Sequence, residues 1–193
     1  MCYPYKRQAR KIATLPTTMN LGVYGVACLN DHVFILTHGN EIDIYQKEKT
    51  AYNRRKGIST AKLAKPSDIA ACSSTCRVFV TDSRSYGLWV ISNPMNLNAS
   101  LEPFVKINKP QGLTVRPDGK LVVITEVPSN ICVYESKGNL VCRIPLGKTD
   151  IEHPFQAVSI SAKSFYICSG LTRIQRHSVT KLSDNGTIEV RNI

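Results

Sequence analysis

The sequence predicts an all-β protein, and three observations support this fold class. The 193 residues contain short runs rich in Val, Ile, Tyr and Phe that alternate with Gly, Asn, Asp, Ser and Pro, which is the pattern of strands and turns. No segment has the 3.6-residue apolar period of an amphipathic helix. Prolines recur every 44 residues, at Pro66, Pro110 and Pro154. A repeat of this length predicts a stack of similar sheets.

Each copy of the repeat begins in the same way. A polar or basic residue precedes the proline, two mainly polar positions or a glycine follow it, and a small or apolar residue then starts a strand. Three copies begin at Lys65, Lys109 and His153. A fourth, near residues 23–27, has no proline, but its Gly25 precedes Gly112 by 87 residues, which is two periods less one.

The copies predict four-stranded meanders. In residues 109–145 the expected strands are 112–116, 120–126, 130–135 and 140–145. The preceding copy gives 67–72, 77–82, 87–92 and 102–107, and the last gives 155–161, 164–169, 173–182 and 187–191. A proline can open the first strand because the start of a strand spares the missing N–H donor.

Four meanders that are each too small to bury both faces predict a β-propeller of about four four-stranded blades. The expected divisions are a basic segment 1–18, in which residues 11–16 are a candidate closing strand, and blades at 19–62, 63–106, 107–150 and 151–193. A sandwich of the same strands is the alternative, but it would not need the repeat to return in register. We expect an open or incomplete ring whose exposed blade edges favour self-association.

Two copies resemble NHL repeats. Residues 109–145, with the Asp118-Gly119-Lys120 turn and an apolar run that ends at Glu126, resemble a full NHL blade, and residues 67–82 resemble another. Over about residues 20–193 the chain resembles the NHL-like propellers of invertebrates, which are related to the C-terminal propellers of tripartite-motif proteins. The resemblance implies a ring that usually has six blades, and it implies RNA binding as one function. The chain departs from the pattern where Cys168-Ser169 replaces the usual acidic residue.

Composition and charge narrow the classes of partner. Lys and Arg number 25 against 14 Asp and Glu, a net charge of +11, which favours an acidic partner or nucleic acid. The excess is uneven, with +7 in residues 1–65 and +4 in the remainder. No apolar run reaches the roughly 18 residues that cross a bilayer, and no signal segment is evident, so we expect a cytoplasmic protein with no membrane partner. Seven cysteines in strand-like segments indicate buried reduced thiols.

No motif of a known catalytic centre emerges from the sequence. Gly147-Lys148-Thr149 resembles the end of a phosphate loop, but Cys142 stands where the loop requires glycine. Cys72 and Cys76 have a spacing suited to zinc without a second pair of ligands. Because the histidines are scattered singly, we expect no metal, no cofactor and no enzymatic activity. Asp82 and Glu126 are either a calcium or catalytic pair, or partners of backbone amides between blades.

In a propeller, the loops that enter the first strand of each blade and those that join the middle strands share one face. The candidate binding residues are therefore Lys62, Lys65, Lys109 and His153 from the entering loops, and His38, Arg84, Tyr86 and Arg173 from the middle loops. Arg and Tyr are typical of protein interfaces, and basic residues with an aromatic are typical of RNA-binding surfaces. We expect a non-catalytic scaffold that binds a protein partner. Binding of single-stranded RNA is the alternative, and a metal-dependent propeller hydrolase or lyase is a more distant one.

Overall fold

The computed structural model describes residues 22–37, 40–49, 51–85, 87–147, 151, 153–161, 164–171, 176–183 and 188–192. The basic segment 1–18, with its candidate closing strand, lies outside the described residues. The described residues form antiparallel four-stranded sheets and no helix, and therefore no helix that could span a membrane. The all-β prediction is confirmed.

Each sheet is one meander, with its strands in chain order. The first contains β1 (Val23–Leu29), β2 (His32–Thr37), β3 (Glu41–Glu48) and β4 (Ala51–Ser59). The second contains β5 (Pro66–Cys72), β6 (Arg77–Asp82), β7 (Gly87–Ser92) and β8 (Glu102–Lys106). The third contains β9 (Pro110–Val115), β10 (Leu121–Thr125), β11 (Asn130–Tyr134) and β12 (Leu140–Pro145). The fourth contains β13 (Pro154–Ser161), β14 (Ser164–Leu171), β15 (Arg176–Ser183) and β16 (Ile188–Asn192).

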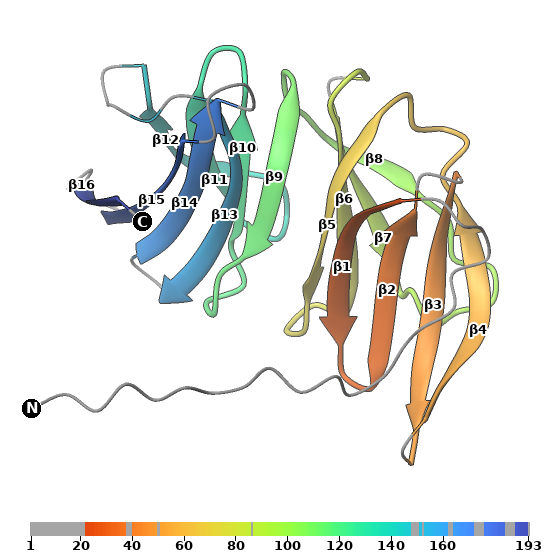
Figure 1. Cartoon of the computed structure of the whole chain (residues 1–193). Coiled ribbons are helices and arrows are strands. Elements are labelled where there is room, and N and C mark those ends of the chain that lie inside the picture. Colours follow the sequence, from red (N-terminus) through yellow and green to blue (C-terminus); the bar gives the residue numbers. More distant parts are fainter. Residues whose placement is uncertain are drawn as a thin grey trace, which may run out of the picture.

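The first strands of the sheets lie next to one another. β1 contacts β5, β5 contacts β9, and β9 contacts β13, so these inner strands surround a common axis. Figure 1 shows the sheets following one another in chain order, from β1–β4 on the right to β13–β16 on the left. This arrangement is an open partial propeller of four blades, as predicted. The sandwich alternative is wrong, because strands pair only within their own copy.

The hydrophobic core lies between successive sheets. The fourth residue of each inner strand packs against the preceding sheet, and Ile69, Leu113 and Ala157 are only 3%, 2% and 1% exposed at this position. Val26 is the same residue of β1 and is 56% exposed. Because each sheet buries its apolar residues against a neighbour, the stability of the fold comes mainly from the contacts between sheets.

The turns at the other end of the sheets contain the glycines that the repeat predicts. Gly119 and Gly138 have φ angles of +81° and +96°, a conformation that glycine adopts without steric cost. Pro66, Pro110 and Pro154 are the first residues of β5, β9 and β13, where a missing N–H leaves no gap in the ladder.

Candidate functional site

One end of the sheets carries both the loops that enter the inner strands and the loops that join the middle strands. The N–H of Ser83, between β6 and β7, donates to the carbonyl of Lys65 before β5 at 2.9 Å. The N–H of Glu126, between β10 and β11, donates to the carbonyl of Lys109 before β9 at 3.1 Å. We call this end of the molecule the loop face.

The structure places four of the eight candidate binding residues on the loop face. Lys65, Arg84 and His153 are exposed there, and Lys109 is half-buried. The Lys62 ammonium instead donates to the carbonyl of Leu101 at 3.4 Å, so it points towards the loop between β7 and β8. The other three candidates, His38, Tyr86 and Arg173, lie outside the described residues.

The buried carboxylate of Asp82 fixes the conformation of two loops. It accepts hydrogen bonds from the N–H groups of Ala64, Lys65, Arg84 and Ser85 at 2.7, 2.8, 3.1 and 3.3 Å, and from the Ser85 hydroxyl at 2.6 Å. Burial raises the pKa of Asp82, but these hydrogen bonds outweigh burial and hold the pKa below its ordinary value. Lys65 and Arg84 are thus held on a well-ordered pair of loops.

Glu126 has a different environment from Asp82. Asp82 is the last residue of β6, whereas β10 ends at Thr125 and Glu126 follows it. It is exposed and accepts a hydrogen bond from the Gln111 amide at 3.1 Å. Asp82 does bond backbone amides, but they belong to its own blade and not to a neighbouring one, and Glu126 bonds a side chain. Among the described residues, no three His, Cys, Asp or Glu side chains are grouped so that they could hold a metal ion.

A cavity of about 340 Å³ lies between the inner strands, close to the axis. Among the described residues that line it, Asp68, the third residue of β5, is the one carboxylate. This carboxylate accepts hydrogen bonds at 2.8 Å from the N–H groups of Ile69 and of Leu113 in the next sheet, and a further one from the Gln156 side chain. Burial raises the pKa of Asp68, and the hydrogen bonds only partly offset this increase.

Glycines make room for the polar groups at the axis. The third residues of the inner strands are Gly25, Asp68, Gly112 and Gln156 in chain order. A Cβ atom at Gly25 would lie 2.8 Å from an Asp68 oxygen, and one at Gly112 would lie 2.5 Å from the Oε1 of Gln156. Glycine therefore alternates with a polar residue so that each polar side chain fits against the preceding sheet.

Two exposed aromatic residues near the axis were not among the sequence candidates. Tyr24 and Phe155 are the second residues of β1 and β13, and they are 36% and 48% exposed. At the same position β5 and β9 carry Ser67 and Gln111. Comparison of the copies position by position, in place of the search for loop residues, would have found this pair.

Comparisons with known proteins relate the chain to solved structures. The chain matches no protein-family model and no curated protein sequence. It is similar to a catalytically inactive virginiamycin B lyase from Staphylococcus aureus crystallised with quinupristin, at 16% identity and a TM-score of 0.69, over 93% of this chain and 58% of the lyase. It is also similar to a streptogramin B lyase, at 14% identity and a TM-score of 0.64, over 92% of this chain and 57% of the other. A protein of unknown function from Bacteroides caccae gives 13% identity and a TM-score of 0.73, over 97% and 73% of the two chains.

These similarities correct one prediction. The expectation that the chain is not an enzyme is contradicted, because the structures that share its fold include an enzyme, virginiamycin B lyase. The sequence argument failed because it searched for compact local motifs, whereas a propeller assembles its loop face from residues of separate copies. The chain spans a little under three fifths of the length of the lyases. At 13–16% identity the comparisons show a shared β-propeller fold, and the NHL assignment stays a resemblance.

Proposed function

We propose that the chain binds an acidic segment of a protein partner through the loop face. The observation that supports this proposal most directly is the pair of exposed cations, Lys65 and Arg84, on loops that the Asp82 carboxylate holds together. A cation on an ordered loop loses little conformational entropy when it binds, and this raises its contribution to affinity.

Backbone geometry at two other candidates supports the same face. Lys109 and His153 occupy equivalent positions directly before a proline, and their φ angles are +43° and +47°. A left-handed conformation is unfavourable for residues with a Cβ, and such conformations concentrate at functional sites. The two side chains therefore leave the chain at the start of β9 and β13 in an orientation that the ordinary backbone would not give.

The proposal is tested by fluorescence anisotropy with a labelled Glu- and Asp-rich peptide. We expect the double variant Lys65→Glu/Arg84→Glu to lose binding, while Lys137→Glu, an exposed lysine in the turn between β11 and β12 at the opposite end, binds as the wild type does. Binding should weaken as salt is raised, because the cations are exposed. Equal losses in the double variant and in Lys137→Glu would contradict a specific role of the loop face.

Single-stranded RNA is the second candidate ligand, and the aromatic pair Tyr24 and Phe155 favours it. The two side chains are exposed, and bases stack on exposed aromatic side chains at about 1–3 kcal/mol per base. With a uridine-rich oligonucleotide as the probe, Phe155→Ala should weaken binding about tenfold or more, and affinity should fall steeply between about 50 and 200 mM salt. If Phe155→Ala keeps the RNA affinity of the wild type, bases do not stack on Phe155, and binding comes only from non-specific charge attraction.

The fold shared with virginiamycin B lyase supports a third candidate, a lyase reaction at the axial cavity. Asp68 is the carboxylate in that cavity. Incubation of the chain with quinupristin, followed by chromatography, tests this directly. Loss of the quinupristin peak with the wild type but not with Asp68→Asn would support the reaction, and no loss with either would exclude this substrate.

A further inference from the structure

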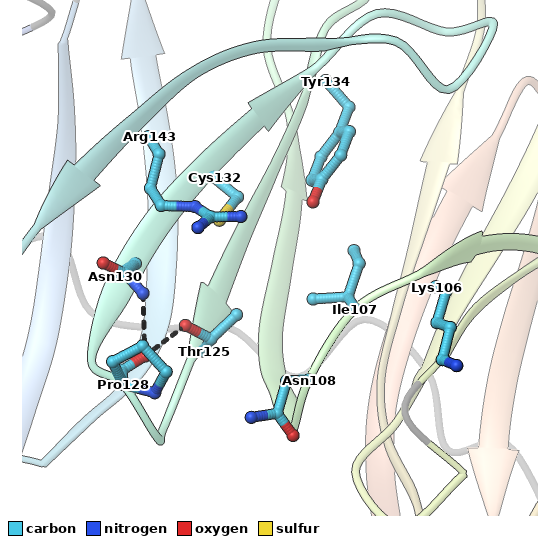
Figure 2. A pocket seen from close by; sticks show the side chains of 9 residues that line it. All are labelled: Lys106, Ile107, Asn108, Thr125, Pro128, Asn130, Cys132, Tyr134 and Arg143. Carbon is cyan, nitrogen blue, oxygen red and sulfur yellow. Dashed lines mark hydrogen bonds between the residues drawn. The ribbon is translucent and has the colours of Figure 1, made fainter.

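A second pocket, of about 120 Å³, lies between the second and third sheets. Its lining comes from the end of β8 and from β10, β11 and β12, and consists of Lys106, Ile107, Asn108, Thr125, Pro128, Asn130, Cys132, Tyr134 and Arg143. Figure 2 shows the guanidinium of Arg143 beside the Cys132 sulfur, and the Tyr134 hydroxyl pointing into the space between the two sheets. The pocket has room for several water molecules or one small ion.

The pocket exists because one sheet carries a small residue where its neighbour carries a large one. The third residue of the third strand is Trp89 in the second sheet and Cys132 in the third. Trp89 pairs with Pro103 across the sheet, and Cys132 pairs with Arg143. Trp89 packs against the core between the first two sheets, whereas the smaller Cys132 leaves space that Arg143 and Tyr134 border.

The charge of the pocket is positive and uncompensated. In the first sheet the corresponding third residue is Asp43, and Arg54 of β4 bonds to it at 2.8 Å and to Glu41 at 3.1 Å. In the third sheet a neutral thiol replaces that carboxylate. Within the described part of the chain no carboxylate lies at ion-pair distance from Arg143 or Lys106, and none lines the pocket.

The other polar groups of the pocket are mostly engaged. The side-chain amides of Asn108 and Asn130 donate to the carbonyls of Val127 and Pro128, at 2.7 and 3.0 Å. The Thr125 hydroxyl donates to the carbonyl of Pro128 at 2.6 Å. The Tyr134 hydroxyl donates to the Cys132 side chain, and the Arg143 guanidinium also hydrogen-bonds to it. Donors to a ligand would therefore come from the remaining N–H groups of Arg143 and from Lys106.

The Cys132 thiol and the Tyr134 hydroxyl both keep their protons at neutral pH. Burial raises the pKa of the Cys132 thiol, although the Arg143 guanidinium opposes this increase. Burial, with a smaller effect of Cys132, raises the pKa of Tyr134 to about 12. Neither group therefore carries a negative charge that would cancel the positive charges of Arg143 and Lys106.

We propose that this pocket binds a phosphate-type oxyanion on the Arg143 guanidinium, with Lys106 at the rim. A guanidinium offers planar paired donors that match the oxygens of a phosphate, and the cavity volume limits the ligand to an ion or the end group of a larger molecule. The pocket borders the loop face, since Asn108 and Pro128 belong to loops at that end of the sheets, but neither Lys65 nor Arg84 lines it, so the site does not depend on the proposed partner.

Cys132 provides a local readout of occupancy. The full chain is treated with iodoacetamide in inorganic phosphate or in chloride of equal ionic strength, and alkylation of each cysteine is followed by mass spectrometry. At a phosphate concentration ten times the dissociation constant, alkylation of Cys132 should slow about tenfold, because only about one pocket in eleven is then empty. The exposed Cys28 and Cys76 are internal controls and should react equally in both salts. Equal reactivity of Cys132 in phosphate and chloride would overturn the proposal.

Variants separate phosphate binding from general charge. Arg143→Gln should weaken phosphate binding by about 10- to 100-fold in calorimetry, and Lys137→Gln, which removes an exposed cation elsewhere, should leave it unchanged. Cys132→Asp supplies the carboxylate that Asp43 provides for Arg54 and should abolish binding. Since Arg143 is exposed, its variant remains informative even if Cys132→Asp fails to fold. Undiminished binding by Arg143→Gln would overturn the proposal.

O-phosphoserine identifies the source of the group. Tighter binding of O-phosphoserine than of inorganic phosphate would assign the pocket to a phosphate monoester, and the reverse order would assign it to the free ion. Failure of both probes to bind would refute the site without affecting the loop-face proposal, because the acidic peptide tests different residues.

Discussion

The carboxylate of Asp68 in β5 accepts a hydrogen bond of 2.8 Å from the backbone N–H of Leu113 in β9. This bond joins the inner strands of two neighbouring sheets at the axis, where β5 and β9 run side by side. It is one of several polar contacts between these sheets, with the Thr81 hydroxyl donating to the Gln111 carbonyl at 2.8 Å as another, beside a core of apolar side chains.

Replacement of Asp68 should separate the effect of the hydrogen bond from that of the charge. Asp68→Ala leaves the Leu113 N–H without its partner and should cost about 1–3 kcal/mol of unfolding free energy. Asp68→Asn removes the buried charge and keeps one acceptor oxygen for the two N–H groups of Ile69 and Leu113, so it loses one of these hydrogen bonds at every pH. Because the folded pKa is raised above 3.8, the wild type has its full contribution from this group below 3.8 and loses it as the pH rises through the folded pKa. Urea unfolding at acidic and neutral pH should show that Asp68→Asn gains on the wild type as the pH rises.

Asp82 should have the opposite pH dependence. Its folded pKa lies below 3.8, so its contribution to stability is present above 3.8 and is lost as the pH falls through the folded pKa. We expect Asp82→Asn to lose about 2–4 kcal/mol at neutral pH, because an amide cannot accept all the hydrogen bonds from Ala64, Lys65, Arg84 and Ser85. The control Glu48→Gln removes an exposed ion pair with Arg55 and should cost less than about 1 kcal/mol. Similar losses in the two variants, measured by urea unfolding, would refute a special role for Asp82.

Two glycines should respond differently to the same substitution. A Cβ at Gly112 would lie 2.6 Å from the backbone carbonyl of Phe155 and 2.8 Å from the Cα of Gln156, and backbone cannot move aside cheaply. We expect Gly112→Ala to cost about 1–3 kcal/mol through overpacking. Gly147→Ala, where a Cβ would meet nothing within 4 Å, should be neutral or slightly stabilising in thermal unfolding. If Gly147→Ala is also destabilised, the loss of stability in Gly112→Ala is not caused by the close approach of the backbone at the axis.

Substitution of Lys109, the residue with a positive φ angle before β9, should have different effects on stability and on peptide binding. Glycine at position 109 relieves a φ angle of +43°, so Lys109→Gly should keep or raise the melting temperature, although it removes a loop-face cation. Lys65→Gly removes a cation at the equivalent position, which lacks a positive φ, and should cost about 0.5–1 kcal/mol. Weaker peptide binding by Lys109→Gly, with no loss of stability, would show that the lysine serves the loop face. A lower melting temperature for Lys109→Gly would contradict the strain argument.

The four sheets could be predicted from the sequence because the repeated residues are prolines and glycines that each fix the local backbone conformation. Pro66, Pro110 and Pro154 open inner strands, and Gly119 and Gly138 form turns with positive φ. Such residues constrain the backbone wherever they occur, so their pattern can be recognised in one sequence without related sequences. The NHL subtype depends on finer features, and the comparisons support only the propeller.

The environment of the site residues could not be predicted in the same way. The sequence paired Asp82 with Glu126 by position, yet one is buried under backbone amides and the other is exposed. β10 is one residue shorter than β6, so Thr125 pairs with Pro110 as Asp82 pairs with Pro66, and the 44-residue spacing places Glu126 one residue beyond the end of its strand. The Arg143 pocket escaped notice because it arises from the packing of two sheets and from no motif within either.

The exchange of Trp89 for Cys132 has a wider consequence for a protein built from repeated units. If every copy carried the same side chain at this position, each junction would be filled equally and the molecule would be solid between its blades. A space large enough for a ligand forms where one repeat has a smaller side chain than the others. Binding sites between blades are therefore expected at positions where the repeats differ in sequence.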